Sequence, residues 1–340
     1  MLIENEKFDV IVIGGGHSGT EAAAASARKG AYTALITTNI NSIGQMSCNP
    51  AIGGLGKGHL VREIDALDGV MGRAIDNSGI HFKILNQSKG PAVQGPRAQA
   101  DRDLYKKEIK HILSETKNLK IVEGTANKII IKNKKITGIK LENNTTIFCS
   151  SLVLTTGTFL GGIIHIGSKK IAAGRFGEKA TKGLSKDLID LGLNLGRLKT
   201  GTPPRIMNET INWNLLTEQK GDESPQPFSF LNKVIKQKQI NCAITRTNQK
   251  THDIIRKSIY LSPVYSGSIE GSGPRYCPSI EDKVVRFPER TSHQIFLEPE
   301  GLNTNIVYPN GISTSLPKKI QKKMLNTILG LEKAKITQYG

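Results

Sequence analysis

The hydrophobic and polar positions near the N-terminus follow the pattern of a strand, a helix and a second strand. Phe8 to Ile13 is a short, mostly apolar run rich in β-branched residues, which is typical of a buried parallel strand. The alanine-rich run from Thr20 to Lys29 predicts a helix that ends at Gly30, and Ala31 to Thr37 predicts the second strand. These three segments together predict a βαβ unit.

The turn inside this unit carries the first chemical signal. Residues 14–19 contain glycines in a GxGxxG pattern, placed between a strand and a helix. Glycines at these places allow a tight turn and let a pyrophosphate approach the helix N-terminus. The acidic residue that usually follows about 20 positions on is missing, because the second strand ends in Thr37-Thr38-Asn39. We therefore expect a dinucleotide whose adenosine end is held by hydroxyl and amide groups, or in a different way.

Residues 40–117 predict two loops and two helices. The segment Ala51 to Gly58 looks like a phosphate loop, but it has Ala51 in place of the first glycine and Gly58 where Ser or Thr must follow Lys57. This departure argues against a nucleoside triphosphatase. We expect a helix from His59 to Leu67, and residues 89–102 to be a loop that enters a helix ending near Lys117.

The next segments complete the predicted fold class. Lys120 to Leu141 alternates apolar and polar residues around a turn at residues 133–135, which predicts a β-meander. Thr145 to Cys149 predicts a further strand, and Ser151 to Thr158 predicts a return to the parallel sheet. This order favours an α/β protein of the glutathione-reductase type, with an FAD-binding Rossmann-like parallel sheet, a β-meander and an inserted smaller α/β domain.

The remaining sequence is less regular. We expect an FAD-binding domain over residues 1–202, an inserted domain with an NAD-binding-like loop over residues 203–285, and a return toward the FAD domain over residues 286–340. A C-terminal helix is predicted over residues 318–335, capped by Ser315-Leu316-Pro317. Its apolar residues recur at helical spacing and predict a core-facing stripe of Ile320, Met324, Ile328 and Leu331.

Charge and cysteine content narrow the function. The chain has 340 residues and a formal net charge of +18, which fits either a polyanionic partner or lysine-rich solvated faces. Its four cysteines (Cys48, Cys149, Cys242 and Cys277) are far apart and form no CxxC pair, so we expect neither a zinc site nor a disulfide scaffold. This cysteine pattern fits a protein of the reducing cytoplasm. No apolar run is long enough to span a bilayer, and the acidic N-terminus does not fit a signal peptide. We expect a cytoplasmic protein with no metal site and no membrane contact.

Five motifs then point to one family. They are residues 13–23, 44–54, 197–205, 273–283 and 308–315. Together they resemble the MnmG (GidA) family of tRNA uridine 5-carboxymethylaminomethyl modification enzymes, over about Phe8 to Ile336. The resemblance implies a homodimer that uses FAD and NADH. With the GTPase MnmE, such proteins add a (carboxymethyl)aminomethyl-type group to C5 of the wobble uridine of certain tRNAs. Family members are longer, and they return to the flavin sheet and dock the GTPase with a helical domain beyond the region matched here.

The resemblance also implies roles for individual residues. The residues implied to hold FAD are Gly14, Gly15, Gly16, His17, Ser18 and Gly19, with further contacts near Ala126 and Thr181. The residues implied to hold NAD are Gly273, Pro274, Arg275, Tyr276, Pro278, Ser279, Ile280, Glu281, Asp282, Lys283 and Phe287. Cys48 and Cys277 match the family's two functional cysteines.

Chemistry gives independent support to a cysteine at this site. C5 of uridine becomes nucleophilic only after a thiolate adds to C6, which requires a reactive, partly exposed cysteine. We expect Cys48 and Cys277 to face one flavin cleft, one adding to C6 and the other acting as acid, base or resolving thiol. Two alternatives stay open: an inactive tRNA-binding remnant, and a folate-dependent tRNA uracil methyltransferase. The arginines in family-like motifs, each of which could contact RNA or pair with a local carboxylate, are Arg97, Arg102, Arg197 and Arg205.

Overall fold

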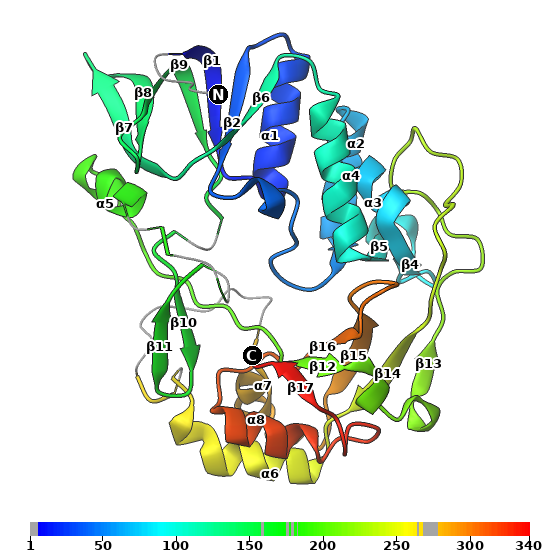
Figure 1. The fold of residues 1–340 in the computed structure, drawn as a ribbon. Coiled ribbons are helices and arrows are strands. Elements are labelled where there is room, and N and C mark those ends of the chain that lie inside the picture. The colour runs from blue at the N-terminus through cyan, green and yellow to red at the C-terminus, as the bar shows by residue number, and fades with distance from the viewer. Residues whose placement is uncertain are drawn as a thin grey trace.

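The βαβ unit lies at the centre of the first of two six-stranded sheets (Figure 1). The computed structural model describes residues 6–157, 160–174, 177, 180–181, 183–263, 265–267 and 278–340. The strand order of the first sheet is β6-β2-β1-β9-β8-β7. The strands are β1 (Lys7–Ile13), β2 (Thr33–Thr37), β6 (Leu119–Glu123), β7 (Ala126–Lys132), β8 (Lys135–Leu141) and β9 (Thr146–Leu154). Strands β6, β2, β1 and β9 are parallel, whereas β8 and β7 add on as antiparallel strands, which confirms the predicted fold class.

Two details of this sheet differ from the sequence pattern. Lys120 to Glu123 belongs to β6, a parallel strand beside β2, and not to the meander. In place of the two strands expected over residues 145–149 and 151–158, the structure has the single strand β9, which ends at Leu154 and pairs with β8 and β1. One strand can serve both neighbours because it has a hydrogen-bonding edge on each side, and Phe148 pairs with both β8 and β1.

A three-stranded antiparallel sheet and three helices form a second layer beside the glycine turn (Figure 1). The sheet contains β3 (Ala51–Gly53), β5 (Gly95–Ala100) and β4 (Gly79–Leu85), in that order. The helices are α2 (Lys57–Ala66), α3 (Met71–Ser78) and α4 (Arg102–Ser114), with α1 (His17–Arg28) between them and the first sheet, and short 3₁₀ turns at η1 (Ile40–Ser42) and η2 (Pro91–Val93). Part of the segment expected as a loop, residues 89–102, is therefore the central strand β5.

The second six-stranded sheet is antiparallel throughout. Its order is β13-β14-β15-β16-β12-β17. The strands are β12 (Arg205–Met207), β13 (Thr217–Gln219), β14 (Cys242–Arg246), β15 (Gln294–Pro299), β16 (Ile306–Asn310) and β17 (Ile336–Gln338). Helices α6 (Gln249–Ser258), α7 (Ile280–Arg286) and α8 (Lys318–Leu325) pack on its apolar face, and their core includes Ile255, Val284, Met324, Ile295 and Leu297. The other elements are a hairpin of β10 (Ile163–Ile166) and β11 (Lys169–Ala172), helix α5 (Gly183–Asp190), and 3₁₀ turns η3 (Asn208–Thr210), η4 (Trp213–Leu215) and η5 (Ile259–Leu261).

The C-terminal segment differs from its expected course. We expected residues 286–340 to lead back toward the first sheet, but β15, β16 and β17 all belong to the second sheet. Helix α8 ends at Leu325, before the predicted end at Lys335. Ile328 and Leu331 are nevertheless fully buried in the turns that follow. The apolar spacing thus marked core positions correctly, although the helical backbone stops earlier.

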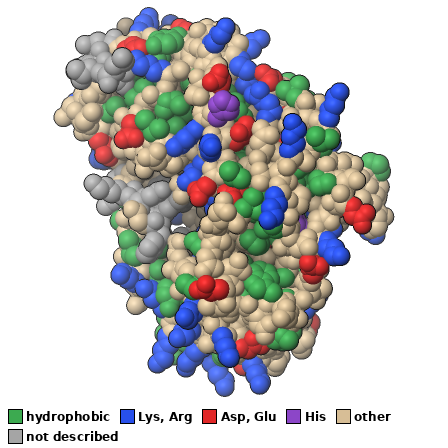
Figure 2. Space-filling model, turned by 45° about the vertical axis from the view of Figure 1, so that its right-hand side comes forward, with side chains coloured by type: hydrophobic (Ala, Val, Ile, Leu, Met, Phe, Trp, Pro, Cys, Tyr) green, Lys and Arg blue, Asp and Glu red, His purple; other side chains and the backbone are tan. Residues whose placement is uncertain are grey.

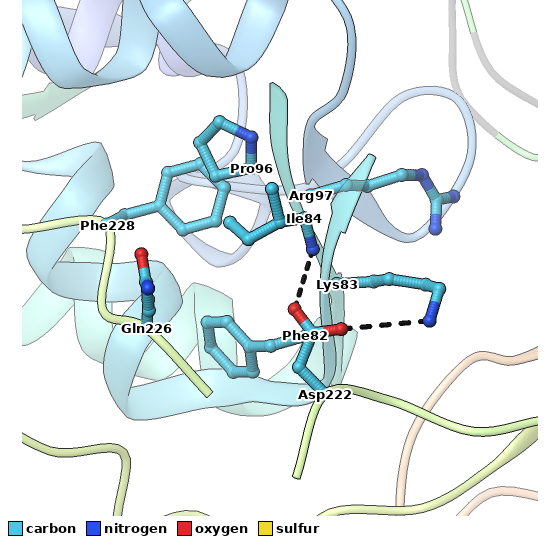
Figure 3. A pocket seen from close by; sticks show the side chains of 8 residues that line it. All are labelled: Phe82, Lys83, Ile84, Pro96, Arg97, Asp222, Gln226 and Phe228. Atoms are coloured by element: carbon cyan, nitrogen blue, oxygen red, sulfur yellow. Dashed lines mark hydrogen bonds and ion pairs between the residues drawn. The ribbon is translucent and has the colours of Figure 1, made fainter. Parts of the chain in front are cut away.

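Residues 220–241 form a crossing segment that connects two units of the chain. The first unit is the first six-stranded sheet with the layer beside it, and the second unit is the second six-stranded sheet with its helices. The buried carboxylate of Asp76 accepts hydrogen bonds from the backbone N–H groups of Phe228 (2.7 Å) and Ser229 (2.9 Å). Figure 3 shows Phe228 beside Pro96 and Phe82, and Asp222 joined to strand β4. Asp222 accepts from the backbone of Ile84 at 2.8 Å. The polar composition of this segment therefore serves an interface, with Phe228 reaching into the first core.

Candidate functional site

The glycine turn leaves no room for side chains at two of its positions. Gly14 has φ +113°, and a Cβ on it would lie 2.3 Å from the Thr155 carbonyl oxygen. A Cβ on Gly19 would lie 1.7 Å from the Gly14 carbonyl oxygen. These two glycines let β1, β9 and α1 meet closely, which explains them without any ligand.

Gly16 is different, because a Cβ on it would meet nothing within 4 Å. It is the N-cap residue of α1, and as a glycine it has no side chain with which to cap the helix N-terminus. A helix start with a glycine N-cap at the carboxyl edge of a parallel sheet, with open space beside that glycine, fits a pyrophosphate. Ser18 is exposed, and the ring of His17 lies 3.4 Å from the hydroxyl of buried Tyr105.

The loop that follows β2 packs directly on the glycine turn. The backbone N–H of Gly44 donates to the Gly15 carbonyl at 2.9 Å. A Cβ on Gly15 would lie 3.0 Å from the side chain of Ile43, which is fully buried. Cys48 lies four residues beyond Gly44, so its loop starts from the predicted dinucleotide site.

Ala126 and Thr181 lie near each other at one side of the first sheet. Ala126 begins β7 and is buried, and the preceding Gly124 donates to the carbonyl of Thr37 at the end of β2. Thr181 bridges to Leu160 just before α5, which packs on β7. Ala126 therefore lies close to the carboxyl end of β2, where the fold predicts a ligand.

Cys48 lies where the first unit meets the second sheet. Its side chain is exposed, and its Sγ lies 3.8 Å from the hydroxyl of Tyr308 on β16. Arg102 donates to the Cys48 carbonyl (2.5 Å) and to the Met46 carbonyl (2.6 Å). Arg102 in turn lies 3.1 Å from a carboxylate oxygen of Glu300. The loop of Cys48 is thus held from both units.

Three of the four arginines in family-like motifs pair with carboxylates of the second sheet. Arg97 lies 2.6 Å from Glu298, and Arg205 and Arg102 share one oxygen of Glu300. Burial raises the pKa of Glu298, and the guanidinium of Arg97 opposes that shift. These arginines therefore follow the second of the two interpretations, pairing with a local carboxylate.

Arg197 makes a different contact: it donates to the Gly161 carbonyl at 3.3 Å. The sequence patterns did not single out Glu298 or Glu300, and they included Tyr308 only as the first residue of the motif 308–315, without a role of its own. The alternation of β15 carried a signal, because residues 296, 298 and 300 share a face opposite to Ile295 and Leu297.

The segment implied to hold NAD is only partly described. Gly273, Pro274, Arg275, Tyr276 and Cys277 lie outside the described residues, so a cleft shared by Cys48 and Cys277 stays a prediction. Pro278 and Ser279 precede α7, which spans Ile280–Arg286, and Phe287 follows it. The helix packs on the apolar face of the second sheet.

Several α7 side chains serve the fold itself. Ser279 and Asp282 form a capping box, which outweighs burial and lowers the pKa of Asp282. Glu281 is fully buried and accepts from the Thr314 hydroxyl at 3.0 Å, while burial raises its pKa. Lys283 donates to the Gly311 carbonyl at 2.8 Å. Ile280 is buried and Phe287 is exposed.

The other two described cysteines are packing residues. Cys149 lies in the core of the first sheet, and burial raises the pKa of its thiol. Cys242 is buried, and burial together with the nearby Glu298 raises its pKa to about 12. Over the described ranges, no three His, Cys, Asp or Glu side chains are placed to hold a metal ion, and no helix is long and apolar enough to cross a membrane.

Comparisons with known proteins agree with the motifs. The family model "Glucose inhibited division protein A" matches residues 9–340. The chain is 57% identical over 336 residues to the tRNA uridine 5-carboxymethylaminomethyl modification enzyme MnmG of Granulibacter bethesdensis, covering 98% of this chain and 53% of that protein. Two crystal forms of Aquifex aeolicus GidA are also similar. Form I gives a TM-score of 0.93 at 50% identity, and form II a TM-score of 0.92 at 48% identity. Each covers 98% of this chain, which spans 57% and 54% of the two solved chains.

Proposed function

Because the chain belongs to the GidA family, we propose that it carries the flavin- and uridine-binding part of a tRNA-modifying enzyme. The modification would be addition of a (carboxymethyl)aminomethyl group to C5 of the wobble uridine, with FAD and NADH. The chain spans about half the length of the relatives that it matches. Activity, tRNA, the MnmE-type GTPase, the homodimer and the cytoplasmic location are accordingly proposals for the whole protein.

One observation supports this function above the others. The loop of Cys48 is hydrogen-bonded to the glycine turn through Gly44, to Arg102 of α4, which pairs with Glu300 after β15, and to Tyr308 of the second sheet. An open helix N-terminus and an exposed thiol thus belong to one continuous loop system. This is the arrangement that a flavin site beside a nucleophilic cysteine requires.

The chain's own residues would divide the chemistry as follows. Gly16 and the start of α1 would hold the pyrophosphate of FAD, with Ala126 and Thr181 toward its adenosine end. FAD, when bound, supplies two-electron redox chemistry, with NADH as the reductant. The Cys48 thiolate would add to C6 of uridine, forming a C–S bond while the C5–C6 π electrons move to O4 as an enolate. After C5 has formed its new bond and lost its proton, elimination of the thiolate would restore the C5–C6 double bond.

The proposals for nicotinamide and RNA contacts come from the α7 motif and from the surface charge. The α7 segment is proposed for NAD on its motif, although Glu281 and Asp282 are already engaged in the fold. Figure 2 shows Lys and Arg side chains over both the upper and the lower part of one face, with acidic side chains between them. Since three motif arginines are paired, exposed lysines would supply most phosphate contacts.

The decisive experiment uses a full-length version of the protein. Cys48→Ser and Cys277→Ser should each abolish tRNA modification while leaving the yellow flavin spectrum intact. Cys149→Ala, a buried cysteine far from either motif, is the matched control and should retain activity. Full activity of either serine variant would remove that cysteine from the mechanism.

Two further outcomes would replace the proposal. A methyl product that depends on folate would indicate the uracil methyltransferase. Binding of tRNA without flavin binding or product would indicate an inactive remnant. Whether or not the protein is active, its affinity for tRNA should fall with salt concentration at a log–log slope near −0.9 per neutralised phosphate on a duplex. A flat response would exclude phosphate-dominated binding.

A further inference from the structure

The contacts around Cys48 form a closed circuit. It starts at the Cys48 carbonyl, passes through Arg102 to one carboxylate oxygen of Glu300, and continues from that oxygen to Arg205. The guanidinium of Arg205 lies over the ring of Tyr308, 4.7 Å from its centroid. The Tyr308 hydroxyl then returns to the Cys48 sulfur at 3.8 Å. Backbone and side chain of Cys48 are therefore held through one carboxylate, Glu300.

Tyr308 is held firmly within this circuit of contacts. It is only 2% exposed, and it lies on β16 directly opposite Glu298 of β15. Arg205 is itself fixed, since it also donates to the Pro203 carbonyl at 2.8 Å. A side chain that is packed and stacked in this way loses little further freedom when its hydroxyl makes a hydrogen bond.

The direction of the hydrogen bond follows from protonation. Burial raises the pKa of Tyr308 far above the physiological range, so its hydroxyl keeps its proton. A thiol and a phenol can exchange donor and acceptor roles, but a thiolate can only accept. As Cys48 loses its proton, Tyr308 becomes the donor, and the overlying guanidinium makes the phenol a stronger one.

We infer that Tyr308 is a positioning residue that orients the Cys48 sulfur and stabilises its thiolate by donating the phenolic hydrogen. This inference rests on the proposed role of Cys48 as the nucleophile. Tyr308 forms no bond to the substrate. It acts by raising the fraction of Cys48 that is ready to attack and by aiming it from the second sheet.

The test measures the thiol itself and needs neither flavin nor tRNA. The rate at which iodoacetamide alkylates Cys48, followed by mass analysis of its peptide, is recorded against pH in the 340-residue chain. Tyr308→Phe keeps the ring and its contact with Arg205 but removes the hydroxyl. We expect the midpoint of the pH profile to rise by about half a unit to one unit, and the rate near neutral pH to fall about 3- to 10-fold.

A second substitution makes the test independent of folding defects. Incorporating 3-fluorotyrosine at position 308 makes the phenol more acidic without changing its shape, and the midpoint should move down. Tyr32→Phe, which removes the hydroxyl of a tyrosine bonded to Glu6 on the first sheet, is the control and should leave the profile unchanged.

Unchanged midpoints in both position-308 variants would overturn the inference. The proposed function would fail separately, by full activity of Cys48→Ser in the full-length protein. Normal alkylation profiles in both position-308 variants together with an inactive Cys48→Ser would therefore reject the role of Tyr308 and keep that of Cys48.

Discussion

The two six-stranded sheets contribute to the site in opposite ways. The first sheet contributes backbone: a glycine turn, a helix start with a glycine N-cap and the loop that leads to Cys48. The second sheet contributes side chains, because the face opposite its apolar core carries Glu298 and Tyr308 toward the first unit. Parallel strands buried on both faces leave only their ends for a ligand, whereas an antiparallel sheet can present one whole polar face. The candidate site lies where a strand-end loop meets such a face.

The largest effect should come from the backbone side of this comparison. Gly19→Ala would place a Cβ within 1.7 Å of the Gly14 carbonyl oxygen, so β1 and α1 would have to separate. We expect a loss of about 3 kcal/mol or more of unfolding free energy, together with loss of flavin binding. Urea unfolding and flavin absorbance measure the two effects.

Gly16→Ala is the matched variant, because its Cβ would meet open space. It should fold with nearly the stability of the unmodified chain but bind flavin about tenfold or more weakly, about 1.4 kcal/mol. Equal flavin affinity in Gly16→Ala would show that the open space is not where the pyrophosphate lies.

The ion pairs Arg97–Glu298 and Arg102–Glu300, which form a side-chain seam between the two units, should give the next largest effect. Arg97→Met leaves the carboxyl of Glu298, 2% exposed, without its cation. We expect about 3 kcal/mol of destabilisation near pH 8. Because burial raises the pKa of Glu298, the carboxyl takes up a proton as pH falls, and the loss should be smaller near pH 5.

The reverse change should be milder, since Arg97 is 19% exposed and can turn toward water. Glu298→Gln should cost about 1 kcal/mol, and the double variant Arg97→Met, Glu298→Gln should be more stable than Arg97→Met alone. A double variant as unstable as the sum of the two would mean that the pair is not coupled across the seam.

The same contrast explains how much could be predicted from sequence. The glycine turn, β1, α1 and β2 follow one another within about 30 residues, so local pattern and turn chemistry suffice to predict them. The second sheet pairs β12 with β17, whose residues 205 and 338 are far apart, and several of its strands have only three residues. No local periodicity can specify such a pairing.

Individual residues show the same limit. Cys48 could be predicted as a candidate because its motif resembles a family. Tyr308 begins another such motif, but its contact with Cys48 could not be predicted, because only the fold brings two residues 260 positions apart within 3.8 Å. Phe228 of the crossing segment shows this too, since a lone apolar side chain among polar ones does not reveal which core it enters.

The smallest predicted effect tests whether the two sheets unfold as one. Each unit buries one histidine: His81, 2% exposed, lies 3.0 Å from the Ile240 carbonyl, and His252, fully buried, lies 2.8 Å from the Thr247 hydroxyl. Burial lowers the pKa of both rings in the folded protein. Below the ordinary histidine pKa the unfolded chain binds protons that the folded chain refuses, so stability is complete above that value and falls as pH falls.

We expect each histidine to account for about 1 kcal/mol of the stability lost between about pH 7.5 and about pH 5.5. His81→Gln and His252→Gln keep polar groups of similar reach and should each flatten the pH dependence of the urea midpoint by a comparable amount. If the Arg97 and Arg102 seam couples the sheets, both variants should act on one transition, and the double variant should flatten it additively. Two transitions, each sensitive to only one of the histidines, would show that the seam does not couple the sheets. The loop of Cys48 would then be held between units that unfold independently, and unfolding of the second unit alone would release its contact with Tyr308.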